Sequence, residues 1–228
     1  MAKILFLMTG SDHWTLRDGT THPTGFWAEE AVAPLEAFRA AGHQVVVATP
    51  GGVAPPADPA SLAVGDADTA AHLAEVIRTS PELAAPVAVE EVDLAGYRAV
   101  FVPGGHGPME DLAVDPEAGR LLADALAGGL VLGVVCHGPA ALLAATGADA
   151  RNAFEGFTVT GFSNAEERIG GLADKAPWLL QDRLEAAGLT VQVGPPFLPH
   201  VVTDRNLLTG QNPASSEPLA VAVIDRLG

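Results

Sequence analysis

Short apolar runs without polar alternation recur along the chain, and they constrain the fold more than any other feature. Such runs are typical of parallel strands that are covered on both faces of a sheet. Segments with helical spacing of apolar residues separate them, among them residues 66–79, 116–127 and 213–227. Strands that alternate with helices predict an α/β fold with a mostly parallel sheet and right-handed crossovers. The predicted buried strands are residues 4–8, 45–48, 99–102 and 130–135.

Several other segments carry more specific expectations. Residues 25–41 have helical spacing and end before Gly42, while Pro34 inside them is expected to kink the helix or to start a second one. Residues 81–93 are expected to form a loop or a short edge strand, and residues 140–145 a helix. Shorter strands are expected at residues 157–160, 191–193, 201–203 and 207–209.

The charge balance excludes whole classes of partner. The chain has 228 residues, a length that suits one domain over 1–228, with 12 Lys and Arg against 28 Asp and Glu, a formal net charge of −16. Such a surface repels phosphate backbones and anionic lipids, so we expect no nucleic-acid and no membrane partner. The stretch 128–149 is very apolar, but Cys136 to Pro139 interrupt it, which argues against a membrane span. The apolar run at the start is too short for a signal peptide, which predicts a cytoplasmic protein.

The single cysteine, Cys136, follows a predicted buried strand at a sharp turn. It cannot form an internal disulfide, and one cysteine excludes a cysteine-based zinc cage. The strand–nucleophile–helix arrangement lifts a side chain over the sheet, although Val134 replaces the first glycine of the usual pattern. The following helix is expected to favour the thiolate and so to lower the pKa of Cys136. The other interpretation is an inert thiol buried in the core.

Two further loops should share the edge of the sheet with Cys136, because ligands of parallel sheets bind at the carboxyl ends of the strands. They are residues 9–12 and residues 103–108, which contain Gly104 and Gly105. The Gly105 amide paired with the His137 amide would form an oxyanion hole, whereas the simpler interpretation is a tight turn.

Acids and histidines supply further candidates. Glu29 and Glu30 point about 100° apart on a helix, so at most one of them faces the core. Burial of that acid would raise its pKa and suit it to proton transfer, whereas the simpler interpretation is a solvated helix start. His106, His137 and His200 are further candidates, each of which alone is more often a structural histidine.

Five motifs in this order resemble the ThiJ/PfpI superfamily, and within it the branch of the cofactor-independent glyoxalase III (D-lactate dehydratase) and related stress-response chaperones. The resemblance covers residues 3 to about 220 and implies a three-layer sandwich, flavodoxin-like or class I glutamine amidotransferase-like. It also implies a homodimer. The motifs are TGFWAEE at residues 24–30, PGGHG at 103–107, VCHGP at 135–139, TGFSNAEE at 160–167 and TGQNPASS at 209–216.

The resemblance assigns roles position by position. Cys136 matches the nucleophile, His137 the histidine that follows it, and Glu30 the acid beside the cysteine. Gly105 matches the oxyanion-side amide, and Glu167 an acid near the site. His106 is expected among the residues that bind substrate, together with Gly105 and Glu167. The metal site of larger relatives is not matched, so no metal and no cofactor are expected.

The implied reaction converts methylglyoxal or glyoxal to lactate or glycolate through a hemithioacetal on Cys136, in defence against reactive carbonyl stress. Its substrate would be a small α-oxoaldehyde, and the enzyme a cysteine-dependent lyase. Two alternatives stay open, a cysteine peptidase or amidase and a redox-regulated holdase-type chaperone. A glutaminase is disfavoured, because no acid stands two residues after His200.

Overall fold

The structure, a computed structural model, describes residues 1–147 and 150–228 and contains a seven-stranded sheet. The strand order is β10-β11-β7-β6-β1-β4-β5, and every neighbouring pair is parallel except β10 with β11. The predicted mostly parallel sheet is therefore confirmed, with one antiparallel strand at its edge. The strands are β1 (Lys3–Leu7), β4 (Gln44–Thr49), β5 (Val87–Ala88), β6 (Tyr97–Val102), β7 (Val131–Val135), β10 (Val201–Asp204) and β11 (Leu207–Gly210).

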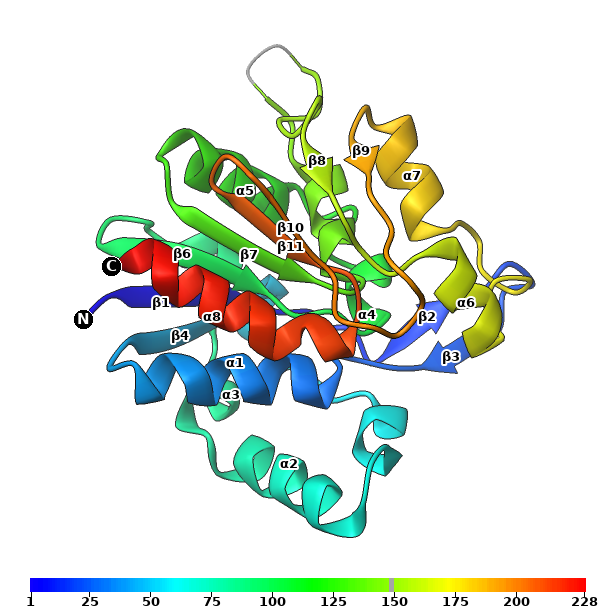
Figure 1. The fold of residues 1–228 in the computed structure, drawn as a ribbon, viewed down its shortest axis with the longest axis horizontal. Coiled ribbons are helices and arrows are strands. Elements are labelled where there is room, and N and C mark those ends of the chain that lie inside the picture. The colour runs from blue at the N-terminus through cyan, green and yellow to red at the C-terminus, as the bar shows by residue number, and fades with distance from the viewer. Residues whose placement is uncertain (148–149) are drawn as a thin grey trace.

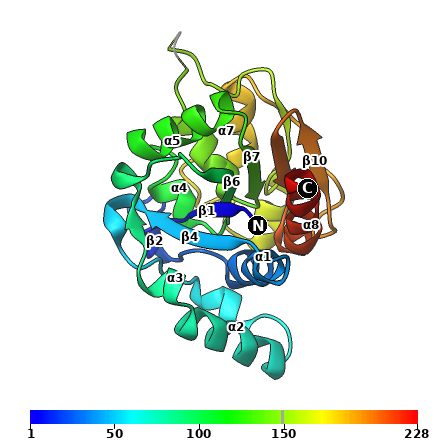
Figure 2. The same ribbon diagram turned by 90° about the vertical axis from the view of Figure 1, so that its left-hand side faces the viewer.

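Helices cover both faces of the sheet and give the predicted three layers (Figure 1). In the view turned by 90°, α1 and α8 lie on one side of the sheet and α5 and α7 on the other (Figure 2). α2 extends the α1 layer outward. The helices are α1 (Ala28–Ala40), α2 (Ala67–Thr79), α3 (Pro81–Ala84), α4 (Gly107–Glu110), α5 (Pro116–Ala127), α6 (Asn164–Gly170), α7 (Leu180–Ala186) and α8 (Ser216–Leu227).

Burial on both faces explains the unbroken apolar strands. Ile4 to Leu7 in β1 are all buried, and successive side chains enter opposite cores. On the α1 side, Phe6 packs between Phe38 and Phe101 with ring centroids 5.8 and 5.1 Å away. Aromatic packing of this kind fixes α1 against the central strands and thereby places its first turn at the edge of the sheet.

Two local expectations need correction and a third is confirmed only in part. α1 runs without a break past Pro34, which lies on its buried face, so packing against α8 outweighs the one missing backbone hydrogen bond. The segment after Cys136 is a 3-10 helix over Gly138–Ala144 rather than a helix over residues 140–145. Residues 81–93 contain the short helix α3 as well as the edge strand β5.

Two small two-stranded sheets lie outside the main one. The hairpin β2 (His13–Thr15) and β3 (Thr21–Pro23) is antiparallel, while β8 (Thr158–Val159) and β9 (Thr190–Val191) are parallel. Within the described ranges no helix is both long and apolar enough to cross a membrane. The apolar stretch 128–149 contributes β7 and the 3-10 helix, and residues 148–149 of it lie outside the described part.

Candidate active site

The turn at Cys136 has the sharp geometry that the sequence predicts. Cys136 adopts a φ of 59°, a left-handed conformation that few residues other than glycine adopt. Its N–H donates to the Gly210 carbonyl at 2.9 Å, and its carbonyl accepts the Phe162 N–H at 2.8 Å. Next to it only glycine fits at position 138, where a Cβ would lie 2.5 Å from the Val102 oxygen. Neighbouring backbone therefore holds the strained turn that presents the sulfur.

Glu30 lies in the first turn of α1 and is completely buried. Its Oε2 accepts the Gly104 N–H at 2.7 Å, while its Oε1 has no hydrogen-bond partner among the described residues. Burial raises the pKa of Glu30 to about 8, although the Cys136 side chain and the Gly104 N–H oppose the shift. The carboxyl is therefore neutral at pH 7. Glu29, by contrast, is exposed, in keeping with the prediction that at most one of the two acids faces inward.

The predicted low pKa of the thiol is wrong. Burial raises the pKa of Cys136 well above its ordinary value, and the neighbouring Glu30 carboxyl raises it further. The Gly105 N–H opposes this shift. The Cys136 side chain is buried at the base of its turn, and the short 3-10 helix after it does not offset the cost of burying a negative charge. Cys136 is thus a thiol at rest and needs a base.

His137 is that base by position. Its Nδ1 lies 3.4 Å from the Cys136 sulfur, and its Nε2 lies 2.8 Å from Oε2 of Glu167. Burial, reinforced by the nearby His106, lowers the pKa of His137 to about 4, so the imidazole is neutral at pH 7. An ionised Glu167 can only accept, so His137 donates through Nε2–H and keeps a free lone pair on Nδ1 facing the sulfur. Cys136, His137 and Glu167 thus form a hydrogen-bonded chain.

Glu167 holds a second imidazole as well. His106 Nε2 lies 3.0 Å from the other carboxylate oxygen, Oε1. Although burial alone would raise the pKa of Glu167, the hydrogen bonds from His106 and His137 hold it well below its usual range. Glu167 thus contacts both histidines, whose rings lie 4.0 Å apart between centroids. It also lines the cavity described below, and its predicted contact with substrate stays a prediction.

A capping box decides which of the two adjacent acids meets the histidines. The Ser163 side chain accepts the Glu166 N–H, and the Glu166 carboxylate accepts the Ser163 N–H in return. Glu166 also accepts from Gln211 and Asn212, which joins the 160–167 and 209–216 motifs. Glu166 therefore stabilises the fold through these hydrogen bonds, and Glu167 is the acid that contacts the histidines.

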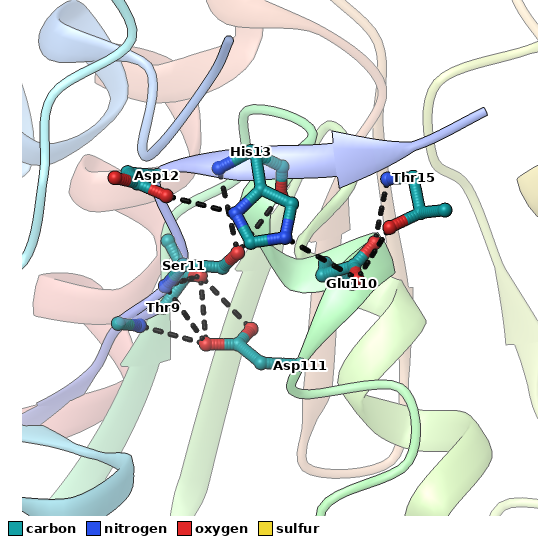
Figure 3. Close-up of polar contacts among 8 residues, drawn as sticks. Thr9, Ser11, Asp12, His13, Thr15, Glu110 and Asp111 are labelled. Atoms are coloured by element: carbon teal, nitrogen blue, oxygen red, sulfur yellow. Dashed lines mark hydrogen bonds and ion pairs between the residues drawn. The ribbon is translucent and has the colours of Figure 1, made fainter. Parts of the chain in front are cut away.

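Hydrogen bonds to Glu110 and Asp111 hold the loop after β1 and the start of the hairpin (Figure 3). The Asp111 carboxylate accepts the Thr9 hydroxyl at 2.9 Å and the Gly10 N–H at 2.7 Å, and Glu110 accepts the Thr15 N–H at 2.7 Å. These bonds hold β2 in place, and its buried Trp14 stacks on His106 with ring centroids 5.0 Å apart. Residues 9–12 thus share the edge with 103–108, as predicted, but position the hairpin rather than line the site.

A cavity with a volume of about 590 Å³ opens above Cys136. Its walls include five predicted site residues, namely Gly105, His106, Cys136, His137 and Glu167, whereas Glu30 lies outside the wall and His200 is absent from it. The lining residues that sequence reasoning missed are chiefly Trp27, Asp58, Phe162 and Phe197. Of these four, Trp27 and Phe162 carried a signal, because each stands inside one of the five motifs.

The predicted oxyanion hole has one member in place. Gly105 adopts a φ of 86°, and a Cβ there would lie 2.3 Å from the Gly25 oxygen, so only glycine can bring its N–H to Cys136. Pairing of this amide with the His137 amide on a developing oxyanion stays a prediction.

One group of side chains could hold a metal ion. Ligand atoms of His106, His137 and Glu167 lie within 4.8 Å of one another. Both imidazole Nε2 atoms are already hydrogen-bonded to the carboxylate, so the three side chains satisfy one another without an ion. The expected absence of a metal stays a prediction.

The hydrogen-bonded chain can be tested on the sulfur alone. We expect Glu167→Gln to slow alkylation of Cys136 by iodoacetamide about 10-fold at pH 7, because the neutral amide stabilises the imidazolium–thiolate pair less well. Cys136 is the only cysteine, so mass spectrometry reads its alkylation without interference. Glu185→Gln on α7, outside the cavity wall, is the control. Unchanged alkylation in Glu167→Gln would contradict the arrangement.

The sequence matches a known protein family. The profile of the DJ-1/PfpI family matches residues 22–226. The chain belongs to the DJ-1/PfpI family. The resemblance to the ThiJ/PfpI superfamily is thereby confirmed, and the matched region contains every site residue described above.

Two of the similar proteins carry names from carbonyl chemistry. The chain is 29% identical to the Protein/nucleic acid deglycase HchA of Staphylococcus aureus, over 99% of this chain and 80% of that protein. Glyoxalase III from Candida albicans has a TM-score of 0.83 and 25% identity, over 98% of this chain and 96% of that one. The Rapid Encystment Protein 24 KDa of Francisella tularensis has a TM-score of 0.89 and 28% identity over the whole of both chains. The names of the deglycase and of the glyoxalase associate the family with defence against reactive carbonyls and glycation.

Proposed function

We propose that the protein is a cofactor-independent glyoxalase III that converts methylglyoxal to lactate, and glyoxal to glycolate, through Cys136. One observation carries the proposal. A single sulfur faces the cavity between a neutral imidazole and a buried, protonated carboxyl, so a base and an acid flank one nucleophile. This set is what addition of a thiol to an aldehyde requires.

The first step forms the carbon–sulfur bond. His137 Nδ1 takes the thiol proton of Cys136, and the ionised Glu167 stabilises the imidazolium that results. The sulfur adds to the aldehyde carbon, and the neutral Glu30 gives its proton to the aldehyde oxygen. The product is a hemithioacetal, with Glu30 now a carboxylate and His137 protonated. The raised pKa of Glu30 thus supplies the acid for this step.

The second step moves a proton between carbons. The Glu30 carboxylate removes the hydrogen of the sulfur-bearing carbon while His137 protonates the neighbouring carbonyl oxygen, which gives an enediol. Glu30 then returns its proton to that neighbouring carbon, and His137 takes the proton of the other hydroxyl. A thioester of the 2-hydroxy acid results. The Gly105 N–H, directed at the sulfur, stabilises the negative charge that develops beside it.

The last step restores the enzyme. Glu30 takes a proton from a water that adds to the thioester carbon, and His137 protonates the departing sulfur. Cys136 is again a thiol, Glu30 neutral and His137 neutral, and the acid product loses its proton in solution. No step needs glutathione or a metal ion, in line with the expected lack of a cofactor.

Product analysis tests the proposal. Purified protein should consume methylglyoxal and form an equal amount of lactate in buffer that contains EDTA and no glutathione. Chiral chromatography identifies the lactate enantiomer. Consumption of methylglyoxal without lactate, or a need for added metal or glutathione, would contradict the proposal.

A second candidate is deglycation, because the Staphylococcus aureus relative is named a deglycase. The test uses a preformed methylglyoxal adduct of N-acetyl-lysine. Release of the amine at a rate higher than removal of free methylglyoxal alone can explain would favour deglycation. The peptidase and chaperone alternatives predict cleavage of a peptide and protection of client proteins. Homodimer formation and a cytoplasmic location stay predictions.

A further inference from the structure

The cavity is far larger than the proposed reaction needs. Its volume of about 590 Å³ lies in the range of sites for drug-sized ligands, roughly 300–1,000 Å³. A water molecule occupies about 30 Å³ in the liquid, and a three-carbon aldehyde only a few times that volume. Most of the space above Cys136 is therefore left over when methylglyoxal is bound.

Aromatic rings form the wall that leads outward from the sulfur. The Phe162 ring lies 4.5 Å from the His137 ring between centroids, and the Phe197 ring meets Phe162 edge-on at 6.1 Å. Trp27, Val64 and Leu172 add apolar surface. Phe197 is 44% exposed, so a ligand that covers it gains apolar burial that methylglyoxal cannot reach.

Specific hydrogen bonds, and not side-chain packing alone, fix the backbone of the loop at Phe197. Its φ of 58° is unusual for a bulky side chain, and its N–H donates to Glu166 Oε1 at 2.8 Å. Asn212 binds the same carboxylate oxygen and also the Leu198 carbonyl. The buried Glu166 therefore fixes the loop that carries the ring.

The charges around the cavity have one sign. Among the lining residues that the structure describes, the charged side chains are Glu29, Asp58 and Glu167, and none is lysine or arginine. Glu167 is paired with the histidines, and Asp58 accepts the Thr24 hydroxyl at 2.7 Å. Glu29 is exposed. A substrate with a carboxylate of its own would be repelled by these acids and would find no cationic partner in this wall.

We propose that the site selects neutral α-oxoaldehydes with a bulky aromatic or apolar group over methylglyoxal, and that it rejects anionic analogues. Phe162 and Phe197 hold the large group while the aldehyde carbon reaches Cys136. Glu29 discriminates against negative charge. This inference rests on the proposed glyoxalase function and names the substrate class of the same site.

Three substrates separate the effects of size and charge. They are methylglyoxal, phenylglyoxal and 4-carboxyphenylglyoxal, with lactate and the two mandelates measured as products. We expect kcat/KM for phenylglyoxal to exceed that for methylglyoxal about 10-fold or more. We expect kcat/KM for 4-carboxyphenylglyoxal to be about 10-fold lower than that for phenylglyoxal.

Two variants test which residues cause the effects of size and charge. Each variant is compared with the parent protein by the ratio of kcat/KM for two aldehydes, so the intrinsic reactivity of the aldehydes cancels. Phe197→Ala should lower the phenylglyoxal-to-methylglyoxal ratio of kcat/KM about 10-fold through KM, whereas Leu198→Ala, its exposed neighbour outside the wall, should leave the ratio unchanged. Glu29→Gln should raise the ratio of 4-carboxyphenylglyoxal to phenylglyoxal several-fold. Glu36→Gln, exposed on the same helix outside the cavity wall, should not.

The outcomes distinguish this inference from the proposed function. Turnover of methylglyoxal without a gain for phenylglyoxal, or equal turnover of the anionic analogue, overturns the inference and leaves the glyoxalase function in place. Turnover of none of the three overturns both. A Phe197→Ala variant that loses activity equally toward both neutral aldehydes also overturns it.

Discussion

Cys136→Ser should abolish lactate formation from methylglyoxal, with a loss in kcat of about 10³-fold or more. A hydroxyl is far less acidic than a thiol, and His137, whose pKa is lowered to about 4 by burial, is too weak a base to ionise it. The sulfur is the only thiol of the chain, so no other cysteine can replace it.

The serine variant is a mild structural change, which makes its result decisive. The side chain keeps its size, and the bonds that hold the turn, from Cys136 N–H to Gly210 and from Phe162 N–H to the Cys136 carbonyl, involve backbone alone. Circular dichroism and a melting temperature within a few degrees of the parent protein are the controls. If Cys136→Ser kept a tenth of the activity, the sulfur would not be the nucleophile. Client protection that persists in this variant would instead favour the chaperone alternative.

The same residue shows what the sequence could and could not predict. Its position at the end of a buried strand follows from local pattern, because an unbroken apolar run and a turn before Gly138 and Pro139 need no distant information. Its pKa does not follow, because it depends on complete burial and on Glu30, which is 106 positions earlier in the chain (136 − 30). The helix that follows Cys136 predicts a lowered pKa, which is the opposite of the observed direction.

Long-range packing also accounts for the missing parts of the cavity. Phe197 lies in a loop without periodicity, and its left-handed backbone is fixed by Glu166, a contact between residues 31 apart. Trp14 reaches His106 only because Asp111 and Glu110 anchor the hairpin from a different part of the chain. The motif at 160–167 indicates Glu167, but its contacts with His106 and His137 join residues that are 61 and 30 positions apart. Such contacts join segments that are distant in the sequence, and the local pattern of neither segment predicts the contact.

Glu30→Gln should lower kcat for methylglyoxal by about 10²- to 10⁴-fold while the fold is kept, because the amide can neither give nor take the protons that Glu30 transfers in each of the three steps. The amide oxygen can still accept the Gly104 N–H that Oε2 now accepts at 2.7 Å. Deuterium exchange into the 2-position of lactate, measured in heavy water, adds a readout specific to proton transfer between carbons. Glu36→Gln, on the same helix and exposed, is the matched control. Activity within a few-fold of the parent protein would contradict the role of Glu30.

The same substitution should change how stability depends on pH. The pKa of Glu30 is raised from an ordinary 4.5 to about 8, so between these values the folded protein holds a proton that the unfolded chain releases. The contribution of Glu30 to stability is therefore full below pH 4.5 and is lost as pH rises toward 8. Relative to Glu30→Gln, the parent protein should lose stability on the order of 4 kcal/mol between pH 5 and pH 8.5, measured by urea unfolding at both values. Parallel pH profiles for the two proteins would mean that Glu30 is ionised in the folded state, and the acid of the first step would then have to be another group.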